Sequence, residues 1–304
     1  MFIKIMLITK HQNSCINSHD RLHITFSGKE HICFCHCCKR PEEKSEIISI
    51  DSLYNLTKEE FKNLLFNAYT KIPENHKYET DFYCQTKSKY CIYNELSLKF
   101  VAVDIFRYCN IHCPMCHISK NQFMTFDENK KLYFFILNYL KGLDLNTIQL
   151  TGLGEPFMLK KETIEWLSTL NINDVKNILI VTNATLLDLN DIIKLSEISK
   201  NTGIKINIMT SCSAITKETY KIVHNNNNFD KVIENICNLN KYGLLEFINF
   251  VIQPENLHEL EFYKEYWLEK GINVKKCLSN IIVGNHDISI KIENSDEYKR
   301  FLQN

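Results

Sequence analysis

The chain of 304 residues has no excess of charge of either sign, because 36 lysines and arginines balance 36 aspartates and glutamates. This balance gives no sign of a nucleic-acid partner. No stretch of about 18 apolar residues predicts a membrane-spanning helix. The apolar start of the chain is too short for a secretion signal and contains Lys4. We therefore expect a soluble, cytoplasmic protein with no nucleic-acid or membrane partner.

The sequence also lacks internal repeats, and it contains no carboxylate pair or Ser/His/Asp set that we would defend as a catalytic site. Cysteine, by contrast, is abundant, with 13 in the chain. In a protein expected to stay in the cytoplasm, this many cysteines predict metal or cluster ligands rather than disulfides.

Three cysteines, Cys109, Cys113 and Cys116, form a C-x3-C-x2-C pattern directly after an apolar, strand-like run at 98–104. An iron–sulfur cube needs four ligands, one for each iron. Three thiolates leave one iron open, where a substrate or cofactor can bind. The alternative is a chance grouping of cysteines. His112 lies between them, but such a loop usually turns this residue outward, so we do not count it as a ligand.

From residue 98 onward, short apolar runs typical of buried parallel strands alternate with helix-like stretches. The expected strands are 99–104, 147–151, 178–182, 204–209, 246–252 and 273–278. The expected helices are 127–140, 162–170, 190–200, 217–223, 230–242 and 257–270, with a last one near 295–302. Six strand–helix units in this order predict a parallel sheet with right-handed crossovers, whose ligands gather at the carboxyl ends of the strands.

A second marker, Gly152-Leu153-Gly154-Glu155-Pro156, follows the second expected strand. Glycines let backbone carbonyls approach a ligand closely, and proline restricts the exit from the turn. Alone, this pattern would indicate a plain turn. Together with the cysteine triplet it resembles the radical S-adenosylmethionine (radical SAM) superfamily, whose Gly-Gly-Glu-Pro turn is similar except that Leu153 is inserted here.

The resemblance implies an α/β fold with a partial (β/α)6 barrel over residues 98–284, followed by a polar tail at 285–304. It implies a [4Fe–4S] cluster on the three cysteines, with SAM bound at the open iron. The residues that it places against SAM are Gly152, Gly154, Glu155, Pro156, Asn183, Ser211 and Gln253.

The region of Ser211 departs from the family pattern, because Ser213 and Ala214 replace an Asp-Gly pair and His224 stands where relatives often have arginine. The alternative role for Ser211 is that of a helix N-cap. Cys212 is a candidate to return a hydrogen atom to a substrate radical, and its alternative is a small core residue.

Two other strand ends leave alternatives open. Asn183 is followed by Ala184 where the family's Thr-Asn-Gly turn has glycine. Gln253 and Asn256 end the fifth strand and are either functional or plain turn residues.

Residues 1–97 do not follow the alternation, and we expect them to form a separate, small, cysteine-rich α+β domain. The spacing Cys15-x12-Gly28-x4-Cys33 resembles the first half of the auxiliary-cluster motif of SPASM and twitch domains, with Gly28 in a hairpin turn between strands at 22–25 and 31–33. A helix at 57–70 follows, with Thr57 as N-cap and Glu60 completing a capping box.

The same resemblance implies a second, fully ligated [4Fe–4S] cluster. Its expected ligands are Cys15, Cys33, Cys84 and Cys91. Most relatives carry this domain after the barrel, whereas here it precedes it. Any of Cys35, Cys37 and Cys38 could replace Cys33, and a zinc site is the alternative for the whole region. Cys237 and Cys277 are expected to be unligated, buried cysteines.

The family resemblance implies an oxidoreductase-like enzyme that reductively cleaves SAM to a 5′-deoxyadenosyl radical, which abstracts a hydrogen atom from the substrate. Its implied partner is a reductant such as flavodoxin or ferredoxin. We favour a sugar or small-metabolite substrate and dehydrogenation or epimerisation, because assigning 1–97 to the cysteine domain leaves no peptide-docking domain. The alternatives are a peptide-modifying maturase and a non-catalytic, cysteine-rich metal-binding protein.

Overall fold

The computed structural model describes residues 21–27, 29–35, 46–70, 99–116, 124–150, 154–281, 292 and 295–303. Their contacts divide the chain into two compact units. The first contains the described residues within 1–105, 123–149 and 173–176, and the second contains those within 106–122, 150–172 and 177–304. Each unit combines strands and helices, in keeping with the expected α/β class.

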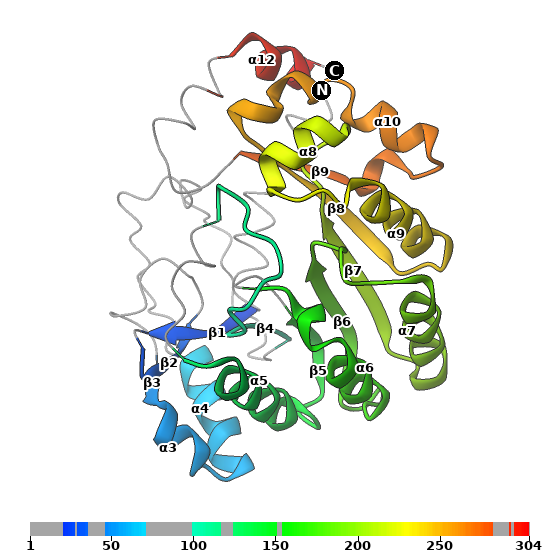
Figure 1. Cartoon of the computed structure of the whole chain (residues 1–304). Coiled ribbons are helices and arrows are strands. Elements are labelled where there is room, and N and C mark those ends of the chain that lie inside the picture. The colour runs from blue at the N-terminus through cyan, green and yellow to red at the C-terminus, as the bar shows by residue number, and fades with distance from the viewer. Residues whose placement is uncertain are drawn as a thin grey trace. The chain divides into compact units, whose positions relative to one another are not determined.

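The first unit is built on strands in the order β3-β2-β1-β4-β5. Its strands are β1 (Arg21–Ser27), β2 (His31–Cys35), β3 (Glu46–Ser49), β4 (Phe100–Asp104) and β5 (Leu145–Leu150). Its helices are α3 (Ile50–Tyr54), α4 (Lys58–Thr70) and α5 (Phe126–Leu140), drawn from blue to green in Figure 1. Strands β1, β2 and β3 are antiparallel neighbours, which confirms the predicted hairpin.

Strand β1 also lies parallel to β4, with Leu22 opposite Val101 and Thr25 opposite Asp104. The described part of the N-terminal segment therefore shares a sheet with the first strand of the strand–helix alternation. The expected domain boundary at residue 98 stays a prediction. The predicted capping box of α4 is present, since Thr57 N–H donates to Glu60 at 2.7 Å and Glu60 N–H donates to Thr57 Oγ1 at 3.2 Å.

The second unit contains a parallel sheet with strand order β6-β7-β8-β9. Its strands are β6 (Val175–Thr182), β7 (Lys205–Ser211), β8 (Leu245–Ile252) and β9 (Cys277–Ile281). Its α-helices are α6 (Lys160–Ser168), α7 (Leu189–Thr202), α8 (Lys217–His224), α9 (Phe229–Lys241), α10 (Tyr263–Glu269) and α12 (Asp296–Gln303). Its 3-10 helices are η1 (Pro156–Leu159), η2 (Pro254–Glu259) and η3 (Val274–Lys276). The expected parallel arrangement is confirmed.

Burial alternates along these strands as the period of two requires. Ile180 in β6, Ile208 in β7 and Phe250 in β8 have no exposed surface. The residues directly before and after each of them in its strand are half-buried. The helices α6, α7 and α9 lie along one side of these strands (Figure 1). The apolar core of this unit therefore lies between the helices and one face of the sheet.

The structure differs from two expected elements. The expected helix at 257–270 is divided into η2, which ends at Glu259, and α10, which begins at Tyr263. The expected strand at 273–278 begins only at Cys277, because the Asn273 side chain accepts the Lys275 N–H and starts a 3-10 turn.

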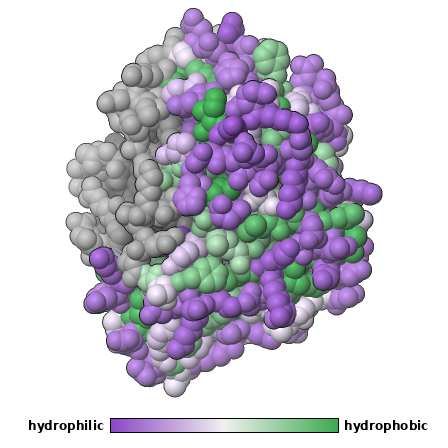
Figure 2. Space-filling view, viewed as in Figure 1, coloured by the Kyte–Doolittle hydropathy of each residue, from purple (hydrophilic) through white to green (hydrophobic). Residues whose placement is uncertain are grey.

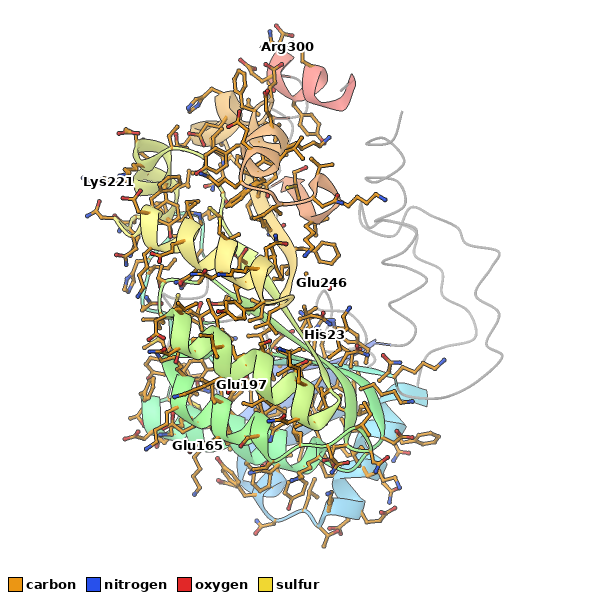
Figure 3. All side chains as sticks on the ribbon, turned by 90° about the vertical axis from the view of Figure 1, so that its right-hand side faces the viewer. His23, Glu165, Glu197, Lys221, Glu246 and Arg300 are labelled. Carbon is orange, nitrogen blue, oxygen red and sulfur yellow. The ribbon has the colours of Figure 1, made fainter. Side chains whose placement is uncertain are left out.

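Charged side chains lie on the outward faces of the helices, as the exposed Glu165, Glu197 and Lys221 show (Figure 3). The face drawn in Figure 2 is mostly hydrophilic, with smaller apolar groups between the polar residues. This distribution is that of amphipathic helices packed against a sheet. No helix among the described residues is long and apolar enough to span a membrane.

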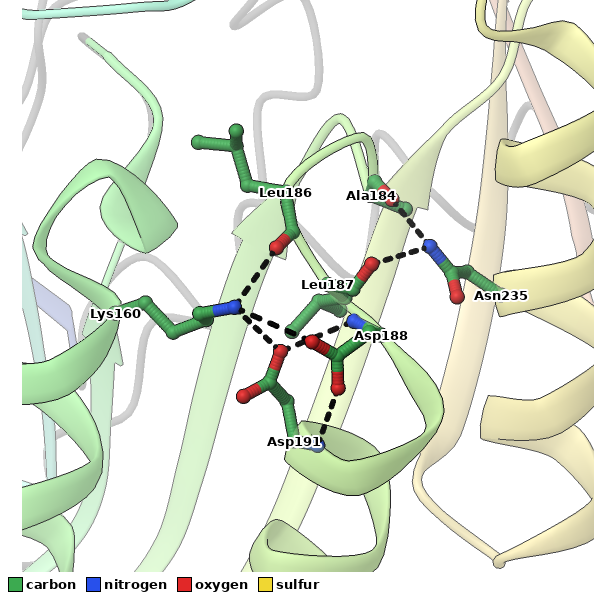
Figure 4. Close-up of polar contacts among 7 residues, drawn as sticks. All are labelled: Lys160, Ala184, Leu186, Leu187, Asp188, Asp191 and Asn235. Carbon is green, nitrogen blue, oxygen red and sulfur yellow. Dashed lines mark hydrogen bonds and ion pairs between the residues drawn. The ribbon is translucent and has the colours of Figure 1, made fainter.

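The loop at 183–188, which leaves β6, is anchored on one side by Lys160 of α6 (Figure 4). Its Nζ donates to the Leu186 carbonyl at 3.3 Å and to Asp191 Oδ2 at 2.7 Å. Asp191 and Asp188 form the capping box that begins α7. The ion pair therefore connects the start of one helix to the start of the next.

On its other side the loop is held by Asn235 of α9, whose side chain is buried. The Asn235 amide donates to the carbonyls of Ala184 and Leu187, both at 2.9 Å (Figure 4). Ala184 lies at φ 59°, in the left-handed region that a residue with a Cβ seldom adopts. The amide thus stabilises a turn that the backbone alone disfavours.

Replacing Asn235 by leucine should lower the free energy of unfolding by about 2–4 kcal/mol, because two buried carbonyls lose their donor. Asn238→Leu, at a half-buried position of the same helix, should change it by less than about 0.5 kcal/mol. Urea unfolding followed by circular dichroism measures both. Equal losses in the two variants would contradict the anchoring role.

Candidate active site

The three cysteines lie on a loop directly after β4, which we call the cysteine loop and define as residues 106–116. All three are half-buried. Burial raises the pKa of Cys113 to about 12, with further contributions from the thiols of Cys109 and Cys116. A bare thiolate at Cys113 is therefore unfavourable, and a cationic group such as iron would hold it deprotonated.

The donor set fits a cluster better than a single metal ion. No three His, Cys, Asp or Glu side chains among the described residues converge as ligands of one ion. An iron–sulfur cube instead binds each thiolate to a different iron, so its ligands need not meet at one point. The three thiols on one loop thus suit a [4Fe–4S] cluster with one open iron.

Gly154 lies directly against the cysteine loop. A Cβ added there would lie 2.4 Å from the Tyr108 carbonyl oxygen and 2.7 Å from that of Phe106. The next residue, Glu155, donates its N–H to the Tyr108 carbonyl at 2.8 Å. Among the described residues, glycine is needed at 154 because this position packs closely against the protein's own backbone, one residue before Cys109. Gly152 lies outside the described residues.

The carboxylate of Glu155 is almost completely buried, with 1% of its surface exposed. It accepts hydrogen bonds from the backbone N–H of Phe157 at 3.0 Å, the hydroxyl of Thr182 at 2.7 Å and the backbone N–H of Asn183 at 2.7 Å. Burial raises its pKa to about 7, against the opposing effect of these bonds. The side chain that the family resemblance places against SAM is thus engaged in joining the 154–156 turn to the end of β6. The next residue, Pro156, is buried at the start of η1.

Asn183 connects the end of β6 to the cysteine loop. Its amide nitrogen lies 3.7 Å from Cys109 Sγ and donates to Asn110 Oδ1 at 3.0 Å. Its amide oxygen accepts from both the N–H and the hydroxyl of Thr185, at 2.9 and 2.6 Å. Both ends of the amide therefore make hydrogen bonds within the protein, and the expected contact of Asn183 with SAM stays a prediction.

Sequence reasoning missed Asn110 and Thr185, whose side chains bond each other at 2.8 Å and close this network. The available signal was the asparagine directly after the first cysteine. Its partner, however, lies 75 residues further along the chain, where no local pattern connects the two.

The ends of the next two strands carry Ser211 and Gln253. Ser211 is half-buried and lies opposite Asn249. The cap of α8 is Thr216, so the alternative role of Ser211 as helix cap is wrong. Gln253 is 5% exposed, and its Nε2 is a buried donor for which the described residues supply no acceptor. An unpaired buried donor calls for an explanation, and a bound ligand supplies one.

Asn256, the other candidate at this strand end, behaves as a turn residue. Its amide donates to the carbonyls of Ser213 and Val251 at 2.8 and 2.9 Å. These bonds tie η2 to the segment that follows β7.

His224, at the end of α8, is brought to the site by the tertiary structure. Its Nδ1 lies 3.5 Å from Cys113 Sγ, and its Nε2 accepts the backbone N–H of Ser213 at 3.0 Å. The ring is 1% exposed, and burial lowers its pKa to about 4. In the sequence, this residue stands out only as a replacement for arginine.

The remaining cysteines give fewer contacts. Cys212 is fully buried, and its thiol donates to the Ala214 carbonyl at 3.4 Å, which suits a core residue. Its role as hydrogen donor stays a prediction. Cys277 is buried as expected, whereas Cys237 is half-buried. The predicted ligands Cys15, Cys84 and Cys91 lie outside the described residues, as do Cys37 and Cys38, and the side chains of Cys33 and Cys35 in β2 are not described either. The auxiliary cluster therefore stays a prediction.

A parallel α/β sheet with a three-cysteine loop after a strand and a glycine turn against that loop defines a class of iron–sulfur protein. The family model described as Radical SAM superfamily matches residues 103–266, more than half of the chain. The chain therefore belongs to the radical SAM superfamily, whose members bind a [4Fe–4S] cluster and SAM.

Several curated relatives are named GTP 3′,8-cyclase. A probable GTP 3′,8-cyclase of Saccharolobus islandicus (strain Y.N.15.51 / Yellowstone #2) is 29% identical over 179 residues, which cover 58% of this chain and 55% of that protein. The GTP 3′,8-cyclase of Clostridium botulinum (strain Hall) is 29% identical over 143 residues, 46% of this chain and 42% of that protein. The chain thus spans about half the length of these relatives.

Among solved structures, the chain is similar to native anSMEcpe with bound AdoMet and Cp18Cys peptide. The TM-score is 0.49 and the identity 20%, over 67% of this chain and 58% of that one.

Replacing Gly154 by alanine should displace the backbone of 106–108, because the new Cβ would overlap main-chain atoms that cannot rotate away. We expect anaerobically reconstituted protein to lose most of the iron bound by the cysteine loop, measured as iron and sulfide per chain. Gly243→Ala is the control, since an added Cβ there has no neighbour within 4 Å and its φ of 74° adds only local strain. Full loading of the Gly154 variant would contradict this account.

Proposed function

We propose that the chain is a radical SAM enzyme that reductively cleaves SAM and abstracts a hydrogen atom from a sugar or small-metabolite substrate. The observation that carries this proposal is the cysteine loop, which the backbone of Gly154 and the amide of Asn183 hold in place. Membership of the superfamily supports it.

In this proposal Cys109, Cys113 and Cys116 hold the [4Fe–4S] cluster. When bound, the cluster supplies the electron that cleaves SAM into methionine and a 5′-deoxyadenosyl radical. The electron comes from a reductant of the flavodoxin or ferredoxin class. The protein's part is to orient SAM beside the cluster and to exclude water from the radical.

The residues proposed to contact SAM differ in what they have available. Gln253 has a buried amide donor for which the described residues offer no acceptor, and this makes it the side chain best suited to bind the cofactor. Ser211 lies at the carboxyl end of the neighbouring strand β7. Gly152 and Pro156 would contribute the shape of the turn. Glu155 and Asn183 act as supports, since their hydrogen-bonding groups are engaged within the protein.

The names of the relatives support a small-molecule substrate. GTP 3′,8-cyclase names a nucleotide, which contains a sugar. We therefore propose that the substrate carries a sugar or a similarly small C–H donor, and that the reaction ends in dehydrogenation or epimerisation. The peptide-modifying alternative shares the cleavage step and differs in the molecule that loses the hydrogen atom.

Reconstituted and reduced protein should convert SAM to 5′-deoxyadenosine, and the Cys109→Ala, Cys113→Ala, Cys116→Ala triple variant should release none, because the electron path to SAM is gone. Liquid chromatography with mass spectrometry measures the product. Cys237→Ala, a half-buried thiol on α9, is the matched control and should keep the activity. Release of 5′-deoxyadenosine by the triple variant would overturn the assignment.

The same assay separates the substrate classes. GTP deuterated on its ribose is the first probe, and transfer of deuterium into 5′-deoxyadenosine would support a sugar substrate. Transfer from a deuterated peptide encoded beside the gene, but from no small molecule, would instead establish the maturase alternative.

For the N-terminal segment we propose a second [4Fe–4S] cluster on Cys15, Cys33, Cys84 and Cys91, supported by their spacing in the sequence. The triple variant above should then retain about four iron atoms per chain, the content of one cube. Metal analysis and electron paramagnetic resonance (EPR) measure this. Zinc in place of iron, or no metal, would exclude the second cluster and leave the SAM cluster unaffected.

A further inference from the structure

His224 makes a direct contact with one of the cysteines proposed to bind the cluster. Its Nδ1 lies 3.5 Å from Cys113 Sγ, within the range of a hydrogen bond to sulfur. The two residues are 111 positions apart in the sequence, so this contact exists only because α8 and the cysteine loop meet in the folded chain. It lies outside the cysteine motif itself.

The direction of this hydrogen bond follows from the other ring nitrogen. The backbone N–H of Ser213 points at His224 Nε2 at 3.0 Å, and a backbone N–H can only donate. Nε2 therefore presents its lone pair, and the proton of the neutral ring is on Nδ1. That N–H is directed at Cys113 Sγ, which accepts it.

The surroundings of His224 hold the ring in this orientation. The ring of Tyr220, one turn earlier on α8, packs against it with centroids 4.5 Å apart. Ser213, which supplies the bond to Nε2, is itself fixed, because its hydroxyl oxygen accepts the Val251 N–H at 3.0 Å and its carbonyl accepts the Asn256 amide at 2.8 Å. The imidazole N–H is thus preorganised toward the sulfur.

We propose that His224 raises the reduction potential of the SAM cluster by donating its Nδ1–H to Cys113 Sγ. The inference rests on the cluster of the proposed function. Reduction adds negative charge to the cluster and its thiolates, and a donor aimed at a thiolate stabilises the reduced form more than the oxidised form. His224 contacts a cluster ligand rather than the substrate, so it is a positioning residue that acts through Cys113.

A second donor reaches the loop from another element. The amide of Asn183, at the end of β6, lies 3.7 Å from Cys109 Sγ. Its bonds to Asn110 and Thr185 make it part of the loop's support, however, so a substitution there would change geometry and potential together. His224 is the donor whose electrostatic effect can be measured separately.

The test compares two variants with the same branched shape. Asparagine at 224 keeps an N–H donor close to the position of Nδ1, whereas leucine has none. Both lose the acceptor for Ser213 N–H, so this loss cancels in the comparison. We expect the potential of the reconstituted cluster in His224→Leu to lie below that of His224→Asn by about 59 mV, a tenfold change in a one-electron equilibrium, measured by redox titration followed by EPR.

A measurement on the unaltered protein keeps the proposal testable if the variants do not fold. In protein labelled with 15N-histidine, pulsed EPR of the reduced cluster should detect a coupled histidine nitrogen. The coupling should persist in His112→Asn, a change at an exposed position. It should be lost in His224→Asn.

Equal potentials for the asparagine and leucine variants would overturn the inference, and so would the absence of histidine coupling in the unaltered protein. In either case the cluster and SAM cleavage would still be observed. If the unaltered protein assembled no cluster on the cysteine loop, the proposed function would fail, and the inference with it.

Discussion

The arrangement of the site depends on the buried carboxylate of Glu155. The backbone N–H of this residue donates to the Tyr108 carbonyl, and its carboxylate accepts from the ends of β6 and the start of η1. A carboxylate removed from water is unfavourable unless hydrogen bonds replace its hydration, and three donors replace part of it here. The same bonds hold the cysteine loop, the glycine turn and the end of β6 together.

This constraint separates the polar residues of the strand ends into two groups. Glu155 and Asn183 direct their hydrogen bonds into the protein, and the amide of Asn183 lies beside Cys109. Gln253 has a buried donor that no acceptor among the described residues engages. Residues that a family motif places around one cofactor can therefore differ in role, because hydrogen-bond capacity used within the protein is no longer available to a ligand.

The electrostatic surroundings of the cysteine loop come from elements distant in sequence. Asn183 approaches Cys109 from the end of β6, and His224 approaches Cys113 from the end of α8. The Thr216 cap determines where α8 begins, and His224 lies in its last turn. The position of a helix on the sheet thus decides which donor faces a thiolate.

The sequence by itself determined the features whose partners are close along the chain. Short apolar runs between helix-like stretches predicted β4 and the strands β5 to β8, because strands buried in a parallel sheet are apolar along most of their length. The Thr57 and Glu60 pair predicted the capping box of α4, because these partners are three residues apart. The cysteine triplet could be recognised for the same reason, because its three ligands lie on one loop.

Only the tertiary structure decided the features whose partners are far apart. These are the pairing of β1 with β4, the division of the expected 257–270 helix, and the roles of Asn183 and His224. The contacts of Asn183 and His224 with cysteines span 74 and 111 residues. The physical reason is that a hydrogen bond depends on the distance and direction between its two groups in space, and separation along the chain encodes neither.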